Sequence, residues 1–563
     1  MKSIFRILIL LLLNTFILAH EQHVHQYLTV EAYYFLKQVL GYDIDEMLLH
    51  LDNGPVSAKW TNGTITSGAW LEDEEDVVYH LRDFIEPFFD GALISITHFW
   101  DADEGDSTPN TFRVNWEGLG GSLNANIGPY PNAYEKIMNF AYPNYSWEIK
   151  YELSNYGLWS FNSISGETVT ITADQIGIKY QKLTNLYKDK IAIISGYDQL
   201  GTWQNCNYEV YIPEEYINFM VWEILGRMCH LLQDISVPAH AHRDEHGMVP
   251  DPFEDHMGEI EHYTFWNHSN IGNSLLNPMN SSNPIHFLMY TTQQIADHFG
   301  SRGPYEGVGD GADGDNLGGN PLTEELVFFQ WGGETNLLQT LGEPTYMASA
   351  YPDAEIENMR DKTIPHVIKT TAGLLYWFAL EANLIVDVSF KNNFNAGILY
   401  LDNNTIDSGT SIPLSVSSNQ VISAIEPQHP GLSHFIWNDT ESPSAEQSSW
   451  KKFVNEVPYP LQNNQNITYY LTVQANDANA IYEADMKEAH KVDKNYDTEF
   501  QGVISNDPKY MVKYSSGNVI ADQYIYPNGY PLVFGGWGDQ IVPNNSRSRP
   551  INNINQDLEV NAN

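Results

Sequence analysis

The chain has 563 residues, and its 72 acidic side chains outnumber 28 basic ones, which gives a formal net charge of −44. This length predicts two or more domains and a sizeable apolar core. An acidic surface repels phosphate backbones and anionic lipid, so it argues against a nucleic-acid-binding protein and is compatible with zwitterionic or cationic partners. A merely soluble acidic protein explains the charge equally well. With only Cys206 and Cys229, a disulfide framework is excluded.

The first 19 residues have the pattern of a secretory signal peptide. Residues 1–6 include the basic Lys2 and Arg6, residues 7–13 are purely apolar, and a cleavage site is expected after Ala19. The apolar run is too short for a membrane span, and no later run is long and apolar enough either. We therefore expect a secreted protein without a transmembrane segment.

Helical spacing of apolar residues is the main pattern in the first two thirds of the chain. It predicts helices over residues 27–40, 71–89, 213–234, 283–298 and 364–382. The clearest helix opens at Pro213, because proline is tolerated at the first helical position. Residues 107–198 are rich in Gly, Asn, Pro and Tyr, and we expect an irregular insertion there.

The character of the chain changes after Asn383. Short β-type runs separated by turn-forming residues predict an all-β, sandwich-like domain over residues 384–490. The runs are residues 385–390, 397–401, 411–416, 420–425 and 467–473. Residues 491–563 are expected to be irregular or weakly β. The predicted fold is thus a mainly α catalytic domain over residues 20–383, followed by a β-sandwich.

His230 and Asp234 form the most informative motif, at the end of the helix that opens at Pro213. A spacing of four residues stacks both side chains on one helix face, here the apolar one. Pro238 then ends the helix, and His240 follows it. This order is typical of a metal site, although His–Asp pairs at this spacing are also common on helix surfaces.

Four further segments carry histidines, carboxylates or both. Imidazole and carboxylate without thiolate suit zinc that is used for hydrolysis. Two ions that share a bridging aspartate can hold both the attacking and the leaving oxygen of a phosphate. A lone histidine is more often a simple hydrogen-bonding group, so the argument depends on the whole set. The five segments are residues 23–30, 65–73, 97–103, 230–240 and 242–256.

In order and local sequence these segments resemble the bacterial zinc-dependent phospholipases C and the related single-strand-specific zinc nucleases. Those proteins are mostly helical and hold three zinc ions in a cleft. The resemblance covers residues 20 to about 254, and it implies that Asp73 is the bridging aspartate. The other ligands that it implies on matching motifs are His25, His98, His230, Asp234 and His240.

Two parts of the implied ligand set depart from the family pattern. The family begins its mature chain with a zinc-binding Trp, whereas the expected first residue here is His20. The family also closes its ligand set with a His-x3-Glu or His-x3-Asp pair. Here Glu254 is preceded four residues earlier by Pro250, so His246 is the expected partner, with Asp251 or His256 as substitutes. Two or three zinc ions are therefore expected.

The resemblance implies a secreted zinc phosphodiester hydrolase of the phospholipase C type, with Asp73 as a bridging ligand or general base. Its substrate would be a phospholipid or another phosphodiester, with transient contact to a membrane surface. The alternatives are a zinc nuclease, which the charge disfavours, and a non-catalytic, metal-stabilised surface-binding protein. Four aromatic residues offer a choline cage or simply core packing: Tyr27, Trp70, Phe99 and Trp100.

Overall fold

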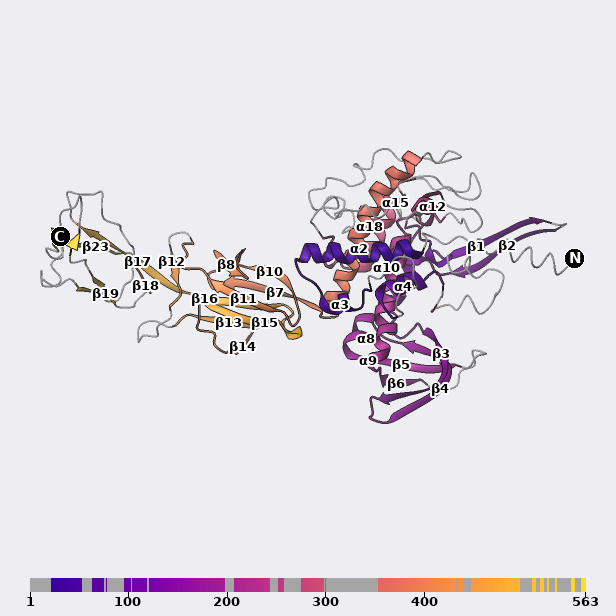
Figure 1. Ribbon diagram of the computed structural model, residues 1–563, viewed down its shortest axis with the longest axis horizontal. Helices are drawn as coiled ribbons and strands as arrows, with labels where there is room; N and C mark the ends of the chain where they lie inside the picture. Colours follow the sequence, from indigo (N-terminus) through magenta and orange to yellow (C-terminus); the bar gives the residue numbers. More distant parts are fainter. Residues whose placement is uncertain are drawn as a thin grey trace. The chain divides into compact units, whose positions relative to one another are not determined.

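The computed structural model describes residues 22–52, 63–74, 77, 96–102, 104–118, 121–197, 207–243, 252–257, 275–297, 299, 353–430, 433–438 and 447–496, with short strands from residue 509 onward. The chain divides into two compact units, Met1–Ala382 and Asn383–Asn563. Each unit is described by itself, and Figure 1 labels their elements. The predicted signal peptide lies outside the described residues.

The helices of the first unit surround a crossing of α4 (Ile65–Leu71) and α10 (Glu223–Asp234). A Cβ on Gly226 would lie 1.8 Å from the carbonyl oxygen of Ile65, and one on Gly68 would lie 1.9 Å from that of Glu223. Only glycine allows the two backbones to come this close. The other main helices are α2 (Gln22–Leu40), which contacts α4 and α18, then α15 (Pro284–Asp297) and α18 (Asp353–Glu381).

Local sequence explains where these helices begin and end. Thr64 caps α4, since its hydroxyl accepts from Ser67 N at 3.1 Å while the Ser67 hydroxyl accepts from Thr64 N at 2.9 Å. The helix predicted from Pro213 is present as α9 (Glu214–Ile217), a π-helical turn (Asn218–Trp222) and α10. Short helices follow at α11 (Pro238–Ala241) and α12 (Pro252–Met257), each with proline in its first turn.

The predicted helix over residues 71–89 is misplaced where the structure describes it. Leu71 ends α4 instead of beginning a helix, and residues 72–74 form a turn. The rest of the range, apart from Val77, lies outside the described residues. The helix expected over residues 27–40 is part of α2, and those expected near 283–298 and 364–382 correspond to α15 and α18.

The prediction of a mainly α catalytic domain is wrong, because the first unit mixes helices and strands. The region expected to be irregular holds an antiparallel hairpin, β1 (Asn110–Gly118) with β2 (Gly121–Tyr130), and much of a closed barrel. The barrel strands are β3 (Ile149–Ser163), β4 (Thr168–Lys179), β5 (Ile191–Tyr197) and β6 (Tyr208–Tyr211). In β4 Ile171 and Ala173 are buried while Thr170 and Thr172 are exposed, which is the alternation of a one-sided strand. Two helices lie in the same region: α7 (Ala133–Ala141) and α8 (Leu183–Asp189).

The second unit contains two sheets that share one apolar core. The strand orders are β10-β7-β16-β13-β14 and β15-β11-β8-β9. Residues from both sheets meet in the core, among them Phe390, Ile422 and Trp450, as expected for a sandwich. The strands are β7 (Ile385–Asn392), β8 (Ile398–Leu401), β9 (Asn404–Asp407), β10 (Thr410–Ser415), β11 (Asn419–Ala424), β13 (Ser449–Val454), β14 (Val457–Tyr459), β15 (Thr468–Thr472) and β16 (Ala480–Asp485).

Further strands of this unit pair beyond the sandwich. The longest, β17 (Lys487–Tyr496), pairs with β12 (His434–Ile436), β18 (Lys509–Val512) and β23 (Leu558–Ala562). The remaining pairs are β19 (Gly517–Ile520) with β22 (Ser548–Ile551), and β20 (Tyr524–Ile525) with β21 (Leu532–Val533). In neither unit does a helix within the described ranges have the length and hydrophobicity needed to cross a membrane.

Candidate metal centre

The last turn of α10 brings the first two predicted ligands together. His230 Nε2 lies 2.9 Å from Asp234 Oδ2, as the spacing of four residues requires, and both side chains are completely buried. The other ring nitrogen, Nδ1, lies 2.7 Å from the carbonyl oxygen of Ala69 in α4. Because a carbonyl oxygen only accepts, Nδ1 carries the proton and Nε2 is left to act as an electron-pair donor.

Helix α2 supplies His25 to the same place. Its Nε2 lies 3.3 Å from Asp234 Oδ1, and its ring stacks on that of His230 with 3.8 Å between the centroids. His25 Nδ1 lies 2.9 Å from Gln233 Oε1, and the Gln233 amide nitrogen donates to Thr29 Oγ1 at 3.0 Å. The glutamine is thereby held with its oxygen toward His25, so Nε2 is again the nitrogen that faces the carboxylate.

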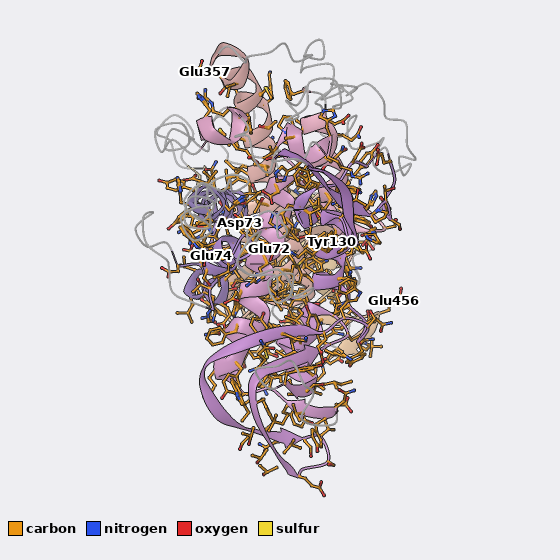
Figure 2. All side chains as sticks on the ribbon, turned by 90° about the vertical axis from the view of Figure 1, so that its right-hand side faces the viewer. Glu72, Asp73, Glu74, Tyr130, Glu357 and Glu456 are labelled. Atoms are coloured by element: carbon orange, nitrogen blue, oxygen red, sulfur yellow. The ribbon has the colours of Figure 1, made fainter. Side chains whose placement is uncertain are left out.

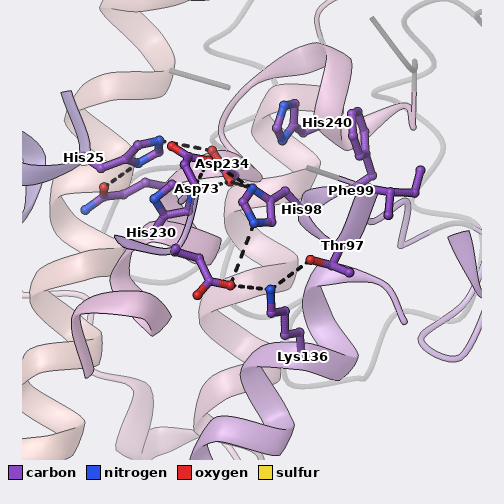
Figure 3. A network of polar contacts seen from close by, with 12 residues as sticks. His25, Asp73, Thr97, His98, Phe99, Lys136, His230, Asp234 and His240 are labelled. Atoms are coloured by element: carbon purple, nitrogen blue, oxygen red, sulfur yellow. Dashed lines mark hydrogen bonds and ion pairs between the residues drawn. The ribbon is translucent and has the colours of Figure 1, made fainter. Parts of the chain in front are cut away.

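Asp73 and His98 complete the cluster from the turn after α4 and from a short 3-10 helix (Ile96–His98). His98 Nδ1 lies 2.9 Å from Asp234 Oδ2 and 3.6 Å from Asp73 Oδ1. The same oxygen of Asp73 lies 3.3 Å from His230 Nε2. Figure 3 shows the imidazoles around the two carboxylates, and Figure 2 shows Asp73 beside Glu72 within the first unit. We call His25, Asp73, His98, His230 and Asp234 the donor cluster.

The donor atoms point into a shared space. They form two overlapping groups, His25 with Asp73 and His230, and His98 with His230 and Asp234, in each of which the atoms lie within 4.8 Å of one another. The shortest separations are 2.9 Å, from Asp234 Oδ2 to His98 Nδ1 and to His230 Nε2. Imidazole nitrogens and carboxylate oxygens gathered in one buried place are ligands that a metal ion takes in proteins. This donor set fits a metal ion.

The electrostatics of the cluster also call for a cation. Burial opposes ionisation of Asp234, but His230, His25 and His98 outweigh it and hold the pKa of this carboxyl well below its usual range. Burial likewise opposes protonation of His230, yet Asp234 and Asp73 raise its pKa well above the ordinary value. Burial lowers the pKa of His98. A single proton on His230 would leave two buried carboxylates only half neutralised, whereas a divalent ion balances both.

His240 and Glu254 form a second donor pair. His240 Nε2 lies 3.1 Å from Glu254 Oε1, and both residues are buried. The pair belongs to neither of the two groups above. The His240 ring stacks on Phe99 at 4.4 Å between centroids, and Trp100 stacks on Tyr134 at 4.9 Å. Phe99 and Trp100 thus have packing partners in the interior, whereas Tyr27 and Trp70 are only half-buried.

The other ligands predicted from sequence lie partly inside and partly outside the described residues. His20, His246 and Asp251 lie outside the described residues, whereas His256 is half-buried in α12. The role of Asp73 as the bridging ligand stays a prediction. Asp234 has the wider set of contacts, because it lies within 3.3 Å of all three imidazoles of the cluster.

Sequence reasoning missed a second set of buried charges next to the cluster, which we call the ion-pair network. Lys136 Nζ lies 2.5 Å from Glu72 Oε1, and Arg227 Nη1 lies 3.0 Å from Glu72 Oε2. Arg227 Nη2 also lies 3.5 Å from Glu223 Oε1. The spacing of Glu223 and Arg227 on one helix is a signal that could have been used, whereas nothing in the sequence singles out Lys136.

No protein-family model matches this chain, and no curated protein matches its sequence.

Proposed function

We propose that this protein is a secreted, zinc-dependent phosphodiester hydrolase of the phospholipase C type. One observation carries the metal-dependent part. Asp73 and Asp234 are buried against three imidazoles, and no lysine or arginine of the described chain forms an ion pair with either of them. Two buried carboxylates matched by a single protonated imidazole are costly unless a metal neutralises them.

The donor chemistry favours zinc among the common ions. The cluster offers imidazole nitrogen and carboxylate oxygen and no thiolate, and Cys229 is buried without a place in it. Zinc bound there would supply a Lewis acid for the phosphoryl group. In such a site the ligands would come from the two donor groups, His98 with His230 and Asp234, and His25 with His230 and Asp73. Gln233 would keep His25 in the correct tautomer, and the Ala69 carbonyl would do the same for His230.

Asp73 is the residue that we assign to proton transfer. It is the most accessible member of the cluster, although only 5 % of it is exposed. Its Oδ2 forms no hydrogen bond within the described residues, while Oδ1 faces His98 and His230. A carboxylate with one oxygen held and the other available is suited to accept the proton of the attacking water.

The phosphodiester class and the export of the protein come from the sequence resemblance and the signal-peptide pattern. The net charge of −44 supports a zwitterionic phospholipid over a polyanion, because a strongly acidic surface repels nucleic acid. A phospholipid substrate requires transient contact with a membrane surface. The expected third ion would use His240 and Glu254, which already lie 3.1 Å apart.

A non-catalytic, metal-stabilised protein is the second candidate. Its support is the complete burial of His25, His98, His230 and Asp234, since structural metal sites are closed. Turnover separates the two candidates: both bind metal, but only the enzyme hydrolyses substrate.

The decisive experiment measures metal content and turnover on the same sample. The purified full chain is analysed for bound transition metals, then tested on phosphatidylcholine vesicles and on single-stranded DNA, with and without chelator. We expect bound zinc, phospholipid hydrolysis that stops on chelation, and slower cleavage of DNA. Absence of transition metal together with chelator-resistant turnover would refute the proposal. Zinc without turnover would favour the structural candidate, and faster DNA cleavage at low salt would favour a nuclease.

A further inference from the structure

The ion-pair network lies beside the donor cluster, and any role it has there rests on the proposed metal site. The three imidazoles of the cluster do not present the same nitrogen. His25 and His230 face the carboxylates with Nε2, whereas His98 faces Asp234 and Asp73 with Nδ1. For His98 to donate an electron pair from Nδ1, its proton must be on Nε2.

Each imidazole has an oxygen near the nitrogen that is turned away from the cluster. For His25 it is Gln233 Oε1 at 2.9 Å, and for His230 it is the Ala69 carbonyl at 2.7 Å. For His98 it is Glu72 Oε1, 3.8 Å from Nε2. The first two oxygens are neutral, so Glu72 is the charged member of this outer set. A negative charge beside Nε2 favours the proton on that nitrogen.

The position of Glu72 is fixed by the network. Its two oxygens are held separately, Oε1 by Lys136 at 2.5 Å and Oε2 by Arg227 at 3.0 Å. Lys136 Nζ also donates to Thr97 Oγ1 at 2.9 Å, one residue before His98. All of these side chains are completely buried, so the carboxylate cannot turn away without leaving a buried cation unpaired. Figure 3 shows the connection from Lys136 through the carboxylate to His98.

We propose that Glu72, held by Lys136 and Arg227, is a positioning residue that sets the tautomer and orientation of His98 for metal binding. The Glu72 carboxylate is not itself one of the donors. It acts through His98, and Lys136 and Arg227 act through it. The network is thereby part of the metal site and not only a support for the fold.

The test compares metal affinities of folded variants. Glu72→Gln alone would leave Lys136 without its carboxylate, so it is combined with Lys136→Met to keep the network neutral. The probes are zinc, titrated against a chromophoric chelator, and cobalt, whose absorption bands report the ligand geometry. We expect the double variant to bind zinc about 10- to 100-fold more weakly than the wild type, with shifted cobalt bands.

The matched control is Glu223→Gln. This residue pairs with Arg227 at 3.5 Å and belongs to the same network, but no contact joins it to His98 among the described residues. It should therefore lose stability and keep the zinc affinity and cobalt spectrum of the wild type. If the double variant fails to fold, Glu72→Asp is used instead, because it keeps the charge and moves it away from His98 by one methylene. For this variant we expect a smaller loss of zinc affinity and a shifted cobalt spectrum.

Wild-type affinity together with an unchanged cobalt spectrum, in the folded double variant or in Glu72→Asp, would overturn the proposal. An equal loss of affinity in Glu223→Gln would also overturn it, because the effect would then be general to the network. A wild-type protein that binds neither zinc nor cobalt would instead refute the metal site itself.

Discussion

The donor cluster and the ion-pair network are neighbouring sets of buried charged side chains that differ in net charge. In the network, two carboxylates are matched by two cations, Lys136 and Arg227. In the cluster, Asp73 and Asp234 face only imidazoles. Burial is the same in both, so burial alone does not separate structure from function. What separates them is the net charge that remains after the protein's own ion-pair partners are counted. That charge determines whether an external cation is needed.

The largest expected effect is on turnover in Asp73→Asn. The substitution keeps the volume and removes the charge that we assign to proton transfer. We expect a loss of about two to four orders of magnitude in kcat. The measurement is phospholipid hydrolysis by the zinc-loaded protein, with a melting curve to show that the fold is kept. Activity within a few-fold of the wild type would mean that Asp73 is not the base.

Lys136→Met should instead affect stability. It leaves Glu72 buried with one cation fewer, which typically costs about 3–5 kcal/mol in the free energy of unfolding. Denaturant unfolding measures this loss, and elemental analysis should find the zinc content unchanged, because Arg227 still holds the carboxylate. If Lys136→Met loses zinc and keeps its stability, the distinction between the donor cluster and the ion-pair network is wrong.

Removing the metal should lower the stability of the protein through the donor cluster and leave the contribution of the ion-pair network unchanged. At a free zinc concentration 100-fold above Kd, the ion contributes about 2.7 kcal/mol of stability, which chelation removes. The check is a fall in Tm of the wild type on chelation and its recovery with added zinc. Lys136→Met should show the same fall from its lower starting point. A Tm insensitive to chelator would contradict a zinc site in the cluster.

Gly226→Ala tests the crossing that supports both sets. The new Cβ would lie 1.8 Å from the carbonyl oxygen of Ile65, so α4 and α10 must move apart. Overpacking of this kind costs about 1–3 kcal/mol, and zinc affinity should fall as well, because Ala69 in α4 orients His230. Gly68→Ala, in the other helix of the crossing, should lower stability and zinc affinity in the same way. Wild-type stability in both variants would show that the crossing is not as tight as described.

Several features of the fold could be predicted from sequence because they depend on local geometry. The pair His230 and Asp234 shares one helix face by spacing alone. The strands of the sandwich follow from short β-type runs between turns. The mixed character of the first unit could not be predicted in this way. In β4 the alternation of Ile171 and Ala173 with threonines is visible, but a strand needs partners, and those come from β3 and β5.

The sequence by itself determined which residue types are available for a metal and in which order they occur. Only the tertiary structure decided which of them meet, because His25, Asp73 and His98 come from separate elements whose positions depend on the glycine crossing and on long-range packing. The same holds for Lys136, an ordinary lysine by sequence, which is placed against Glu72 by α7. Side-chain chemistry is a property of each residue, whereas the charge balance of a buried site belongs to the set of residues that folding brings together.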